Sequence, residues 1–131
     1  MINTFKFTKT LVLGEEFLAA TGNRYEYVTQ RPYHDKKNIL SNGVVLTLRI
    51  LEDKADYGVD KNTNKARPSN KGQNFDATIL NGKTELPLDF GDIVSLEGFD
   101  EENSFAVGFD LIMRFKGVKR LSHAGGAANN A

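Results

Sequence analysis

The sequence predicts an all-β domain that folds as one small barrel. About five stretches of the 131 residues alternate apolar and polar side chains with the period of two that strands impose. A long polar loop follows the second stretch, and a weakly helical link joins the third to the fourth. This pattern fits a five-stranded OB-fold barrel with a long basic loop, possible short helices and an N-terminal arm. The length suits a single domain with one core.

Residues 1–10 are predicted to form an N-terminal arm or an edge strand. Phe5 and Phe7 alternate with Lys6 and Thr8, so the two rings share one face of an extended chain. They either join the core of this domain or dock on a neighbouring protomer. Residues 14–22 then predict a short helix, which Gly22 ends.

The pattern of residues 24–35 predicts the first strand of the barrel. Pro32 cannot donate to a ladder, so the end of this strand lies at an edge or a bulge. Three tyrosines share one face by alternation, flanked by Arg24 and Arg31. The rings form either ordinary core, with hydroxyls at the rim, or a stacking surface. These tyrosines are Tyr25, Tyr27 and Tyr33.

Residues 44–51 predict a central strand that runs directly into the long basic loop. Val44, Leu46 and Leu48 face one way, whereas Arg49 faces the other. A compact domain rarely keeps so long a loop without a use for it. An outward arginine beside a basic loop with one aromatic suggests a platform for a polyanion. The loop residues concerned are Lys54, Tyr57, Lys61, Lys65, Arg67 and Lys71.

Three further strands complete the expected barrel. Residues 74–80 form the third, with Phe75 inward, and residues 92–99 form the fourth. Residues 105–116 form one last strand with a bend at Gly108, an apolar face that includes Phe105 and Met113, and Arg114 on the opposite face. The predicted organisation is therefore an arm at 1–10, the barrel at 11–121 and a flexible tail at 122–131.

The composition and motifs argue against an enzyme. There is no cysteine, which excludes thiol nucleophiles and thiolate metal sites. His34 and His123 are the only histidines, and no nucleotide-binding, hydrolase or metalloprotease motif is present. We expect no cofactor and no metal. No apolar run is long enough to span a bilayer and no signal-peptide core is present, so we expect a soluble, cytoplasmic protein.

The remaining signal is a barrel that carries basic and aromatic side chains. The net charge is zero, so a basic surface must come from segregation of charge along the chain. Proteins that bind single strands combine a positive groove with aromatic rings on which bases stack. The candidate nucleic-acid-binding residues are Arg24, Tyr25, Tyr27, Arg31, Tyr33, Lys36, Lys37, Arg49, Tyr57, Lys61, Lys65, Arg67, Lys71 and Phe75.

Four segments carry a resemblance to a known family. VVLTLRILEDKADYG, QNFDATIL, LDFGDIVSLEG and SFAVGFDLIMRFKGVKRL resemble the small single-stranded DNA-binding proteins of lactococcal phages and related conjugative plasmids of Gram-positive bacteria. The resemblance implies an OB-fold that coats single-stranded DNA during replication or recombination in a bacterial host. It also implies a homo-oligomer, with the N-terminal arm as one route of association. Cellular relatives end in an acidic tip that recruits partners, whereas the tail AGGAANNA has no acid.

Two alternatives stay open. The chain could be a structural or adaptor barrel, for instance a virion or assembly component, in which the aromatics are core and the loop contacts protein. It could also bind single-stranded RNA, because stacking does not distinguish the sugars.

Overall fold

The computed structural model of the chain describes residues 11–34, 40–107 and 110–124. The predicted arm, Lys36, Lys37, Gly108 and residues 125–131 lie outside the described residues. No helix of the described segments is long and apolar enough to cross a membrane. The elements are α1 (Gly14–Ala20), β1 (Tyr25–Tyr33), β2 (Gly43–Ile50), β3 (Asn74–Ile79), β4 (Ile93–Phe99), β5 (Phe105–Val107) and β6 (Asp110–Ser122).

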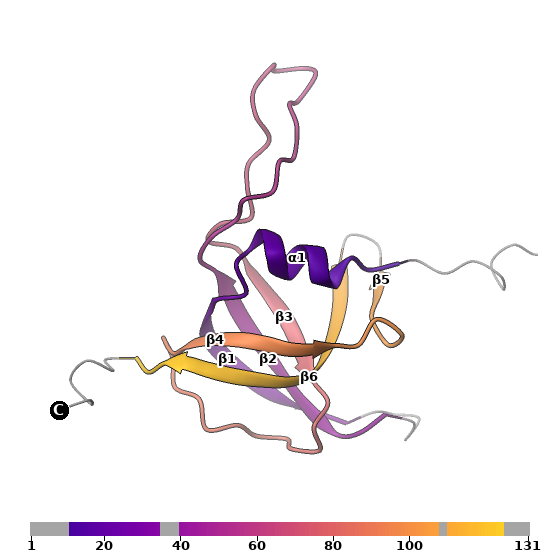
Figure 1. Ribbon diagram of the computed structural model, residues 1–131, viewed down its shortest axis with the longest axis vertical. Helices are drawn as coiled ribbons and strands as arrows, with labels where there is room; N and C mark the ends of the chain where they lie inside the picture. Colours follow the sequence, from indigo (N-terminus) through magenta and orange to yellow (C-terminus); the bar gives the residue numbers. More distant parts are fainter. Residues whose placement is uncertain (1–10, 35–39, 108–109, 125–131) are drawn as a thin grey trace, which may run out of the picture.

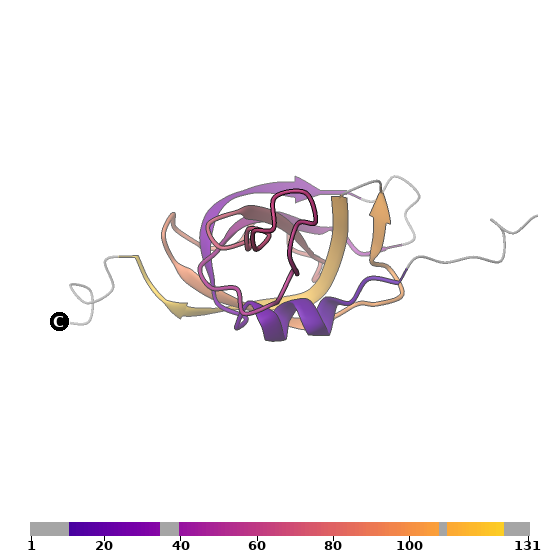
Figure 2. The ribbon, with the colours of Figure 1, turned by 90° about the horizontal axis from the view of Figure 1, so that it is seen from above.

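Five of the strands close into a ring. β1 pairs with β2, β2 with β3, β3 with β6, β6 with β4, and β4 again with β1. The β3–β6 pair is parallel and the others are antiparallel. β5 pairs with the start of β6 outside this ring. Seen from above, the strands curve around a common interior (Figure 2). The predicted β class and the closed sheet of about five strands are therefore confirmed.

The core has the alternation that the sequence predicts for the central strands. Val44, Leu46 and Leu48 of β2 are fully buried, whereas Arg49 between Leu48 and Ile50 is exposed. In β3 the inward Ile79 is also fully buried. These side chains meet across the barrel because period-two alternation sends every second residue inward.

One short helix packs against the outside of the barrel (Figure 1). The Phe17 ring of α1 lies 5.0 Å from Phe75 and 6.2 Å from Tyr25, and Leu18 is buried. The helix ends at Ala20, and Gly22 follows at φ +73°, a left-handed conformation that glycine adopts without strain. The predicted helix is confirmed.

The link between the third and fourth strands, expected to be a loop or a short helical turn, is a loop in the structure. Residues 80–92 contain no helix. Pro87 interrupts the segment, and Gln30 of β1 holds it instead. Gln30 Nε2 donates to Leu86 O and Gln30 Oε1 accepts from Leu86 N, both at 2.8 Å. The side-chain amide thus satisfies the backbone groups that a helix would otherwise pair.

The predicted last strand is a hairpin. Phe105 lies opposite Ile112 and Val107 opposite Asp110, so the chain reverses between β5 and β6. Phe105 and Val107 are consequently exposed, not part of the core face, whereas Met113 is buried as predicted. The apolar alternation continues through the reversal, so the pattern does not reveal it.

The C-terminal boundary of the barrel also moves. β6 continues to Ser122, and the backbone N–H of Ala124 donates to Asp92 Oδ1 at 2.7 Å. Residues 122–124, which the sequence assigned to the flexible tail, therefore belong to the folded domain.

Candidate nucleic-acid interface

A groove opens over the outer face of β2 and β3. Its volume is about 440 Å³, and it lies between the end of β1 and the hairpin of β5 and β6. We call it the aromatic groove. Its lining includes Arg31, Tyr33, His34, Asp76, Phe105 and Arg114.

The centre of the aromatic groove is a guanidinium that contacts two aromatic rings. Arg114 Cζ lies 5.6 Å from the ring centroid of Tyr33 and 5.3 Å from that of Phe105. These distances are within the range of cation–π attraction. Tyr33 is half-buried and Phe105 is 40% exposed, so both rings retain accessible surface. Within the described residues, no carboxylate oxygen lies within 4.0 Å of the Arg114 guanidinium.

The other arginines of this face have carboxylate neighbours. Arg31 Nη2 lies 3.0 Å from Asp76 Oδ2, and Thr47 Oγ1 donates to the other oxygen at 2.9 Å. Arg49 Nη1 lies 3.7 Å from Glu26 Oε1. Both pairs are exposed or half-exposed, so each stabilises the fold by about 1 kcal/mol or less. A polyanion can therefore displace these carboxylates at small cost.

Two of the three predicted stacking tyrosines are core residues, and that prediction is wrong for them. Tyr25 is 0% and Tyr27 is 5% exposed. The hydroxyls of Tyr25 and Thr21 share a hydrogen bond of 2.5 Å. Burial raises the pKa of Tyr25 to about 12, although the bond to Thr21 opposes the shift.

A β-bulge explains why Tyr33 differs from them. The register of β1 against β2 shifts between Tyr27 and Thr29. Tyr27 lies opposite the buried Leu48, but Arg31 lies opposite Val45 on the outer face. The bulge thus places Arg31 and Tyr33 in the aromatic groove, although alternation alone would put them on the interior face with Tyr25 and Tyr27.

A second groove, of about 480 Å³, continues the first toward the end of β2. The two share the lining residues Asp76, Leu111, Ile112 and Met113, so we call them together the trough. Phe75 lies in its wall and is half-buried, with its ring 4.9 Å from that of Tyr25. The predicted candidate Phe75 therefore belongs both to the core and to the trough.

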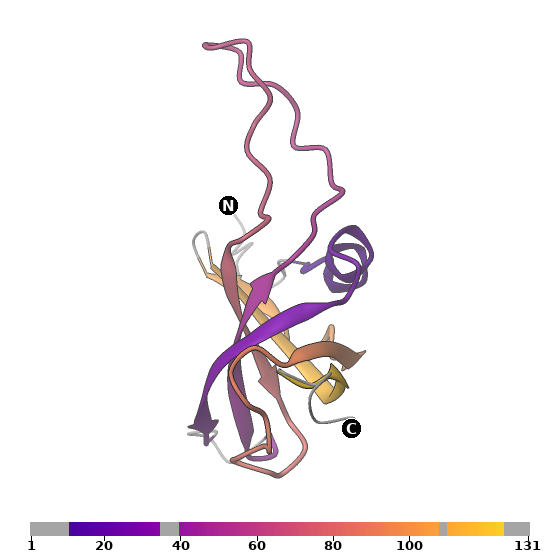
Figure 3. The same ribbon diagram turned by 90° about the vertical axis from the view of Figure 1, so that its left-hand side faces the viewer.

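Residues 51–73 project from the barrel as a long extended loop (Figures 1 and 3), which we call the finger. Its two limbs pair: Val59 bridges to Ala66, and Asp60 N donates to Lys65 O at 2.9 Å. Asn70 near its base lines the trough. The finger therefore continues from one end of the trough.

Asp53 ties together the base of the finger. Its carboxylate accepts hydrogen bonds from Tyr57 Oη at 2.6 Å, Asn70 N at 2.8 Å and Ala55 N at 3.0 Å. Burial raises the pKa of Asp53, but these donors outweigh it and lower the pKa below its usual value. The hydrogen bond between Tyr57 Oη and Asp53 also raises the pKa of Tyr57. The structure thus gives the predicted stacking residue Tyr57 a contact within the finger.

The finger carries cations without carboxylate partners. Asp56 and Asp60 instead accept bonds from backbone N–H groups of their own turns, at 2.8 Å each. In the part of the chain that the structure describes, no carboxylate oxygen lies within 4.0 Å of four exposed cations. These are Lys61, Lys65, Arg67 and Lys71.

The predicted candidate Arg24 stands apart. It is exposed and lines neither groove of the trough.

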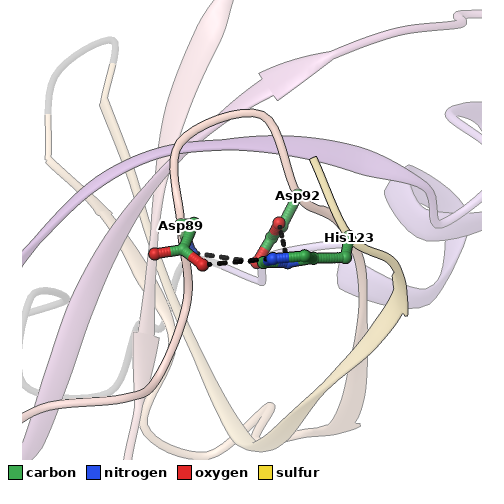
Figure 4. A group of neighbouring side chains, drawn as sticks. All are labelled: Asp89, Asp92 and His123. Carbon is green, nitrogen blue, oxygen red and sulfur yellow. Dashed lines mark hydrogen bonds and ion pairs between the residues drawn. The ribbon is translucent and has the colours of Figure 1, made fainter. Parts of the chain in front are cut away.

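A separate cluster, Asp89, Asp92 and His123, lies at the far end of β6 (Figure 4). Its ligand atoms lie within 4.8 Å of one another, as in a metal site. However, both carboxylate oxygens of the fully buried Asp92 already have partners within the protein. Oδ1 accepts hydrogen bonds from Ala124 N and from His123 Nδ1, the latter at 2.8 Å. Oδ2 accepts a hydrogen bond from Asp89 N at 2.9 Å. Arg120 Nη1 lies 3.6 Å from Asp92 Oδ2, so a cation already compensates the charge. We interpret the cluster as a clasp that fixes the end of β6.

Sequence reasoning missed Phe105 and Arg114. It assigned Phe105 to the core. It placed Arg114 on the strand face that points away from Met113 and gave it no role. The available signal was Arg114 itself, because an arginine that alternates with two inward residues, Met113 and Phe115, must lie on the outer face.

No protein family model matches the chain, and no curated protein or solved structure matches it. The function must therefore be argued from the trough and the finger.

Proposed function

We propose that this protein binds single-stranded DNA, with little sequence preference, along the trough and the finger. We also propose that the closed ring of β1, β2, β3, β6 and β4 is an OB-fold barrel. OB-folds bind oligonucleotides on the face of strands 2 and 3 and between the flanking loops. The aromatic groove has this position, over β2 and β3 and beside the β5–β6 hairpin. The resemblance noted above adds the coating of single strands in phage or plasmid replication or recombination.

Bases would stack on the rings of the aromatic groove. Phe105 and Tyr33 offer partly exposed faces, and stacking is tolerant of sequence because every base has a π-face. The single observation that carries the proposal is the pair of partly exposed rings, Tyr33 and Phe105, in one groove. Accessible aromatic surface beside an exposed arginine, Arg31, suits bases joined by phosphates.

Phosphates beyond the groove would meet the finger. The finger as a whole holds five Lys and Arg and four Asp and Glu, a net charge of +1. Both acids at its start, Glu52 and Asp53, lie at the base, so the part beyond them, residues 54–71, carries five cations and two Asp, a net charge of +3.

Fluorescence anisotropy with labelled oligo-dT, oligo-U and duplex DNA tests the proposal. We expect oligo-dT to bind more tightly than duplex. Phe105→Ala should weaken oligo-dT binding about 5- to 150-fold, because base–aromatic stacking is worth roughly 1–3 kcal/mol. Phe90→Ala is the matched control, since Phe90 is 68% exposed and lines neither groove. Its affinity should equal that of the wild type.

Four outcomes would count against the proposal. Tighter binding of oligo-U would identify an RNA-binding protein. Equal binding of duplex and single strands, or an unchanged affinity of Phe105→Ala, would remove stacking from the mechanism. No binding of any nucleic acid would favour the structural or adaptor barrel.

A further inference from the structure

The protein itself engages part of the Arg114 guanidinium. Nη1 donates to Asn103 O at 2.6 Å, and Nη2 donates to Tyr33 Oη at 3.2 Å. Among the described residues Nε has no acceptor, and it is sealed from solvent, so it is not accessible to a phosphate. Two rings lie beside the group. Of the five N–H groups, one on each Nη therefore remains for a phosphate.

The backbone of Arg114 fixes the turn from which Phe105 extends. Arg114 N donates to Ser104 Oγ at 3.0 Å, and Ser104 Oγ donates to Asp100 O at 2.6 Å. Asp100 N in turn donates to Arg114 O at 2.8 Å. Since Phe105 directly follows this turn, its position depends on the same residue.

The side chain of Arg114 links this turn to a distant strand. Through Tyr33 Oη it reaches the end of β1, and through Asn103 O it holds the turn before β5. These are the two segments that present the aromatic rings. An N–H group buried without an acceptor costs free energy, so this arrangement is not optimal for stability alone.

We infer that Arg114 is a positioning residue: it sets the spacing of the Tyr33 and Phe105 rings for base stacking and does not itself bind phosphate. The inference rests on the proposed function. Lysine cannot replace arginine in this role. Its ammonium is a compact point charge on a flexible stem, whereas the planar guanidinium donates to Asn103 O and Tyr33 Oη from two different nitrogens while Cζ lies within 5.6 Å of both ring centroids.

Salt dependence separates positioning from phosphate binding. On single strands each phosphate contact contributes about −0.7 to the log–log slope of affinity against salt. We therefore compare Arg114→Lys and Arg114→Gln with the same two changes at Arg31, an exposed arginine of the same groove. Thermal unfolding of each variant establishes the folded fraction, and affinity for oligo-dT is expressed per folded molecule.

We expect both Arg114 variants to lose as much affinity as Phe105→Ala, about 5- to 150-fold, with the slope of the wild type. Lysine at position 114 should not rescue binding. By contrast, Arg31→Gln should reduce the magnitude of the slope by about 0.7, and Arg31→Lys should restore it. If Arg114→Gln reduces the magnitude of the salt slope and Arg114→Lys restores affinity, Arg114 is a phosphate ligand and the inference is wrong. Affinity unchanged in both Arg114 variants would also overturn it.

A double-mutant cycle keeps the test decisive if Arg114→Gln folds poorly. On the Phe105→Ala background, Arg114→Lys should cost much less affinity than it costs alone, because the ring it positions is gone. Additive losses would overturn the inference. A wild-type protein that does not bind oligo-dT would instead overturn the proposed function, and this inference with it.

Discussion

The finger allows a quantitative prediction about salt. Replacing Lys61, Lys65 and Arg67 by glutamine removes three exposed cations that have no carboxylate within 4.0 Å in the described chain. If each neutralises one phosphate, the negative log–log slope should become smaller in magnitude by about 2.1. Over the decade from 1 M to 0.1 M salt, this difference in slope between wild type and variant amounts to up to about 100-fold. The variant should therefore bind up to about 100-fold more weakly than the wild type at 0.1 M salt.

The assay is an anisotropy titration at several salt concentrations. The probe is oligo-dT of about 20 nucleotides, longer than the roughly 4–16 nucleotides that one OB-fold covers. The matched control replaces Lys83, Lys116 and Lys119 by glutamine. These three are also exposed, but they lie in neither the trough nor the finger. The change in net charge is the same in the two triple variants. We expect the control to keep a slope close to that of the wild type.

Two results would refute the reasoning. Equal loss of slope in the two triple variants would show that only the overall charge matters. An unchanged slope in the finger variant would show that the finger does not contact the nucleic acid.

Three further predictions concern the contacts of single residues. Tyr25→Ala should lower the free energy of unfolding in urea by about 3–5 kcal/mol, as for other large core aromatics, and leave affinity per folded molecule unchanged; unchanged stability would show that Tyr25 is not core. Asp53→Ala should speed tryptic cleavage within the finger while the thermal midpoint of the barrel changes little; equal cleavage rates would mean that its three hydrogen bonds do not order the finger. Burial raises the pKa of Asp92, but its hydrogen bonds to Asp89 N, Ala124 N and His123 lower it below the ordinary 3.8. The unfolded chain therefore takes up this proton first, so the stabilisation is present above pH 3.8 and lost as the pH falls through the lower folded-state pKa. In urea unfolding as a function of pH, the stability difference between wild type and Asp92→Asn should shrink in acid; a constant difference would contradict the low pKa.

The central strands could be predicted because their two faces differ in chemistry. In β2 the aliphatic Val44, Leu46 and Leu48 alternate with Thr47 and Arg49, so only one face can be core. In β1 tyrosines occupy the candidate inner face, and a tyrosine ring suits both a core and a binding surface. Alternation grouped Tyr25 with Tyr33 but could not detect the bulge that separates them.

The aromatic groove could be predicted only in part, because the reversal between β5 and β6 is invisible in the pattern. The apolar alternation from Phe105 to Phe115 is equally compatible with one strand and with a hairpin. The hairpin turns Phe105 outward and brings it beside Arg114. The finger, in contrast, was evident as a long polar segment with unusual basic content.

The position of β6 in the ring has a consequence for synthesis. β6 pairs with β3, β4 and β5, so the barrel cannot close until residues 110–122 have left the ribosome. A nascent chain without residues 110–122 leaves the edges of β3 and β4 unpaired. Unpaired edges are templates for association with other chains. Chains that end before β6 are therefore expected to aggregate instead of forming a smaller barrel.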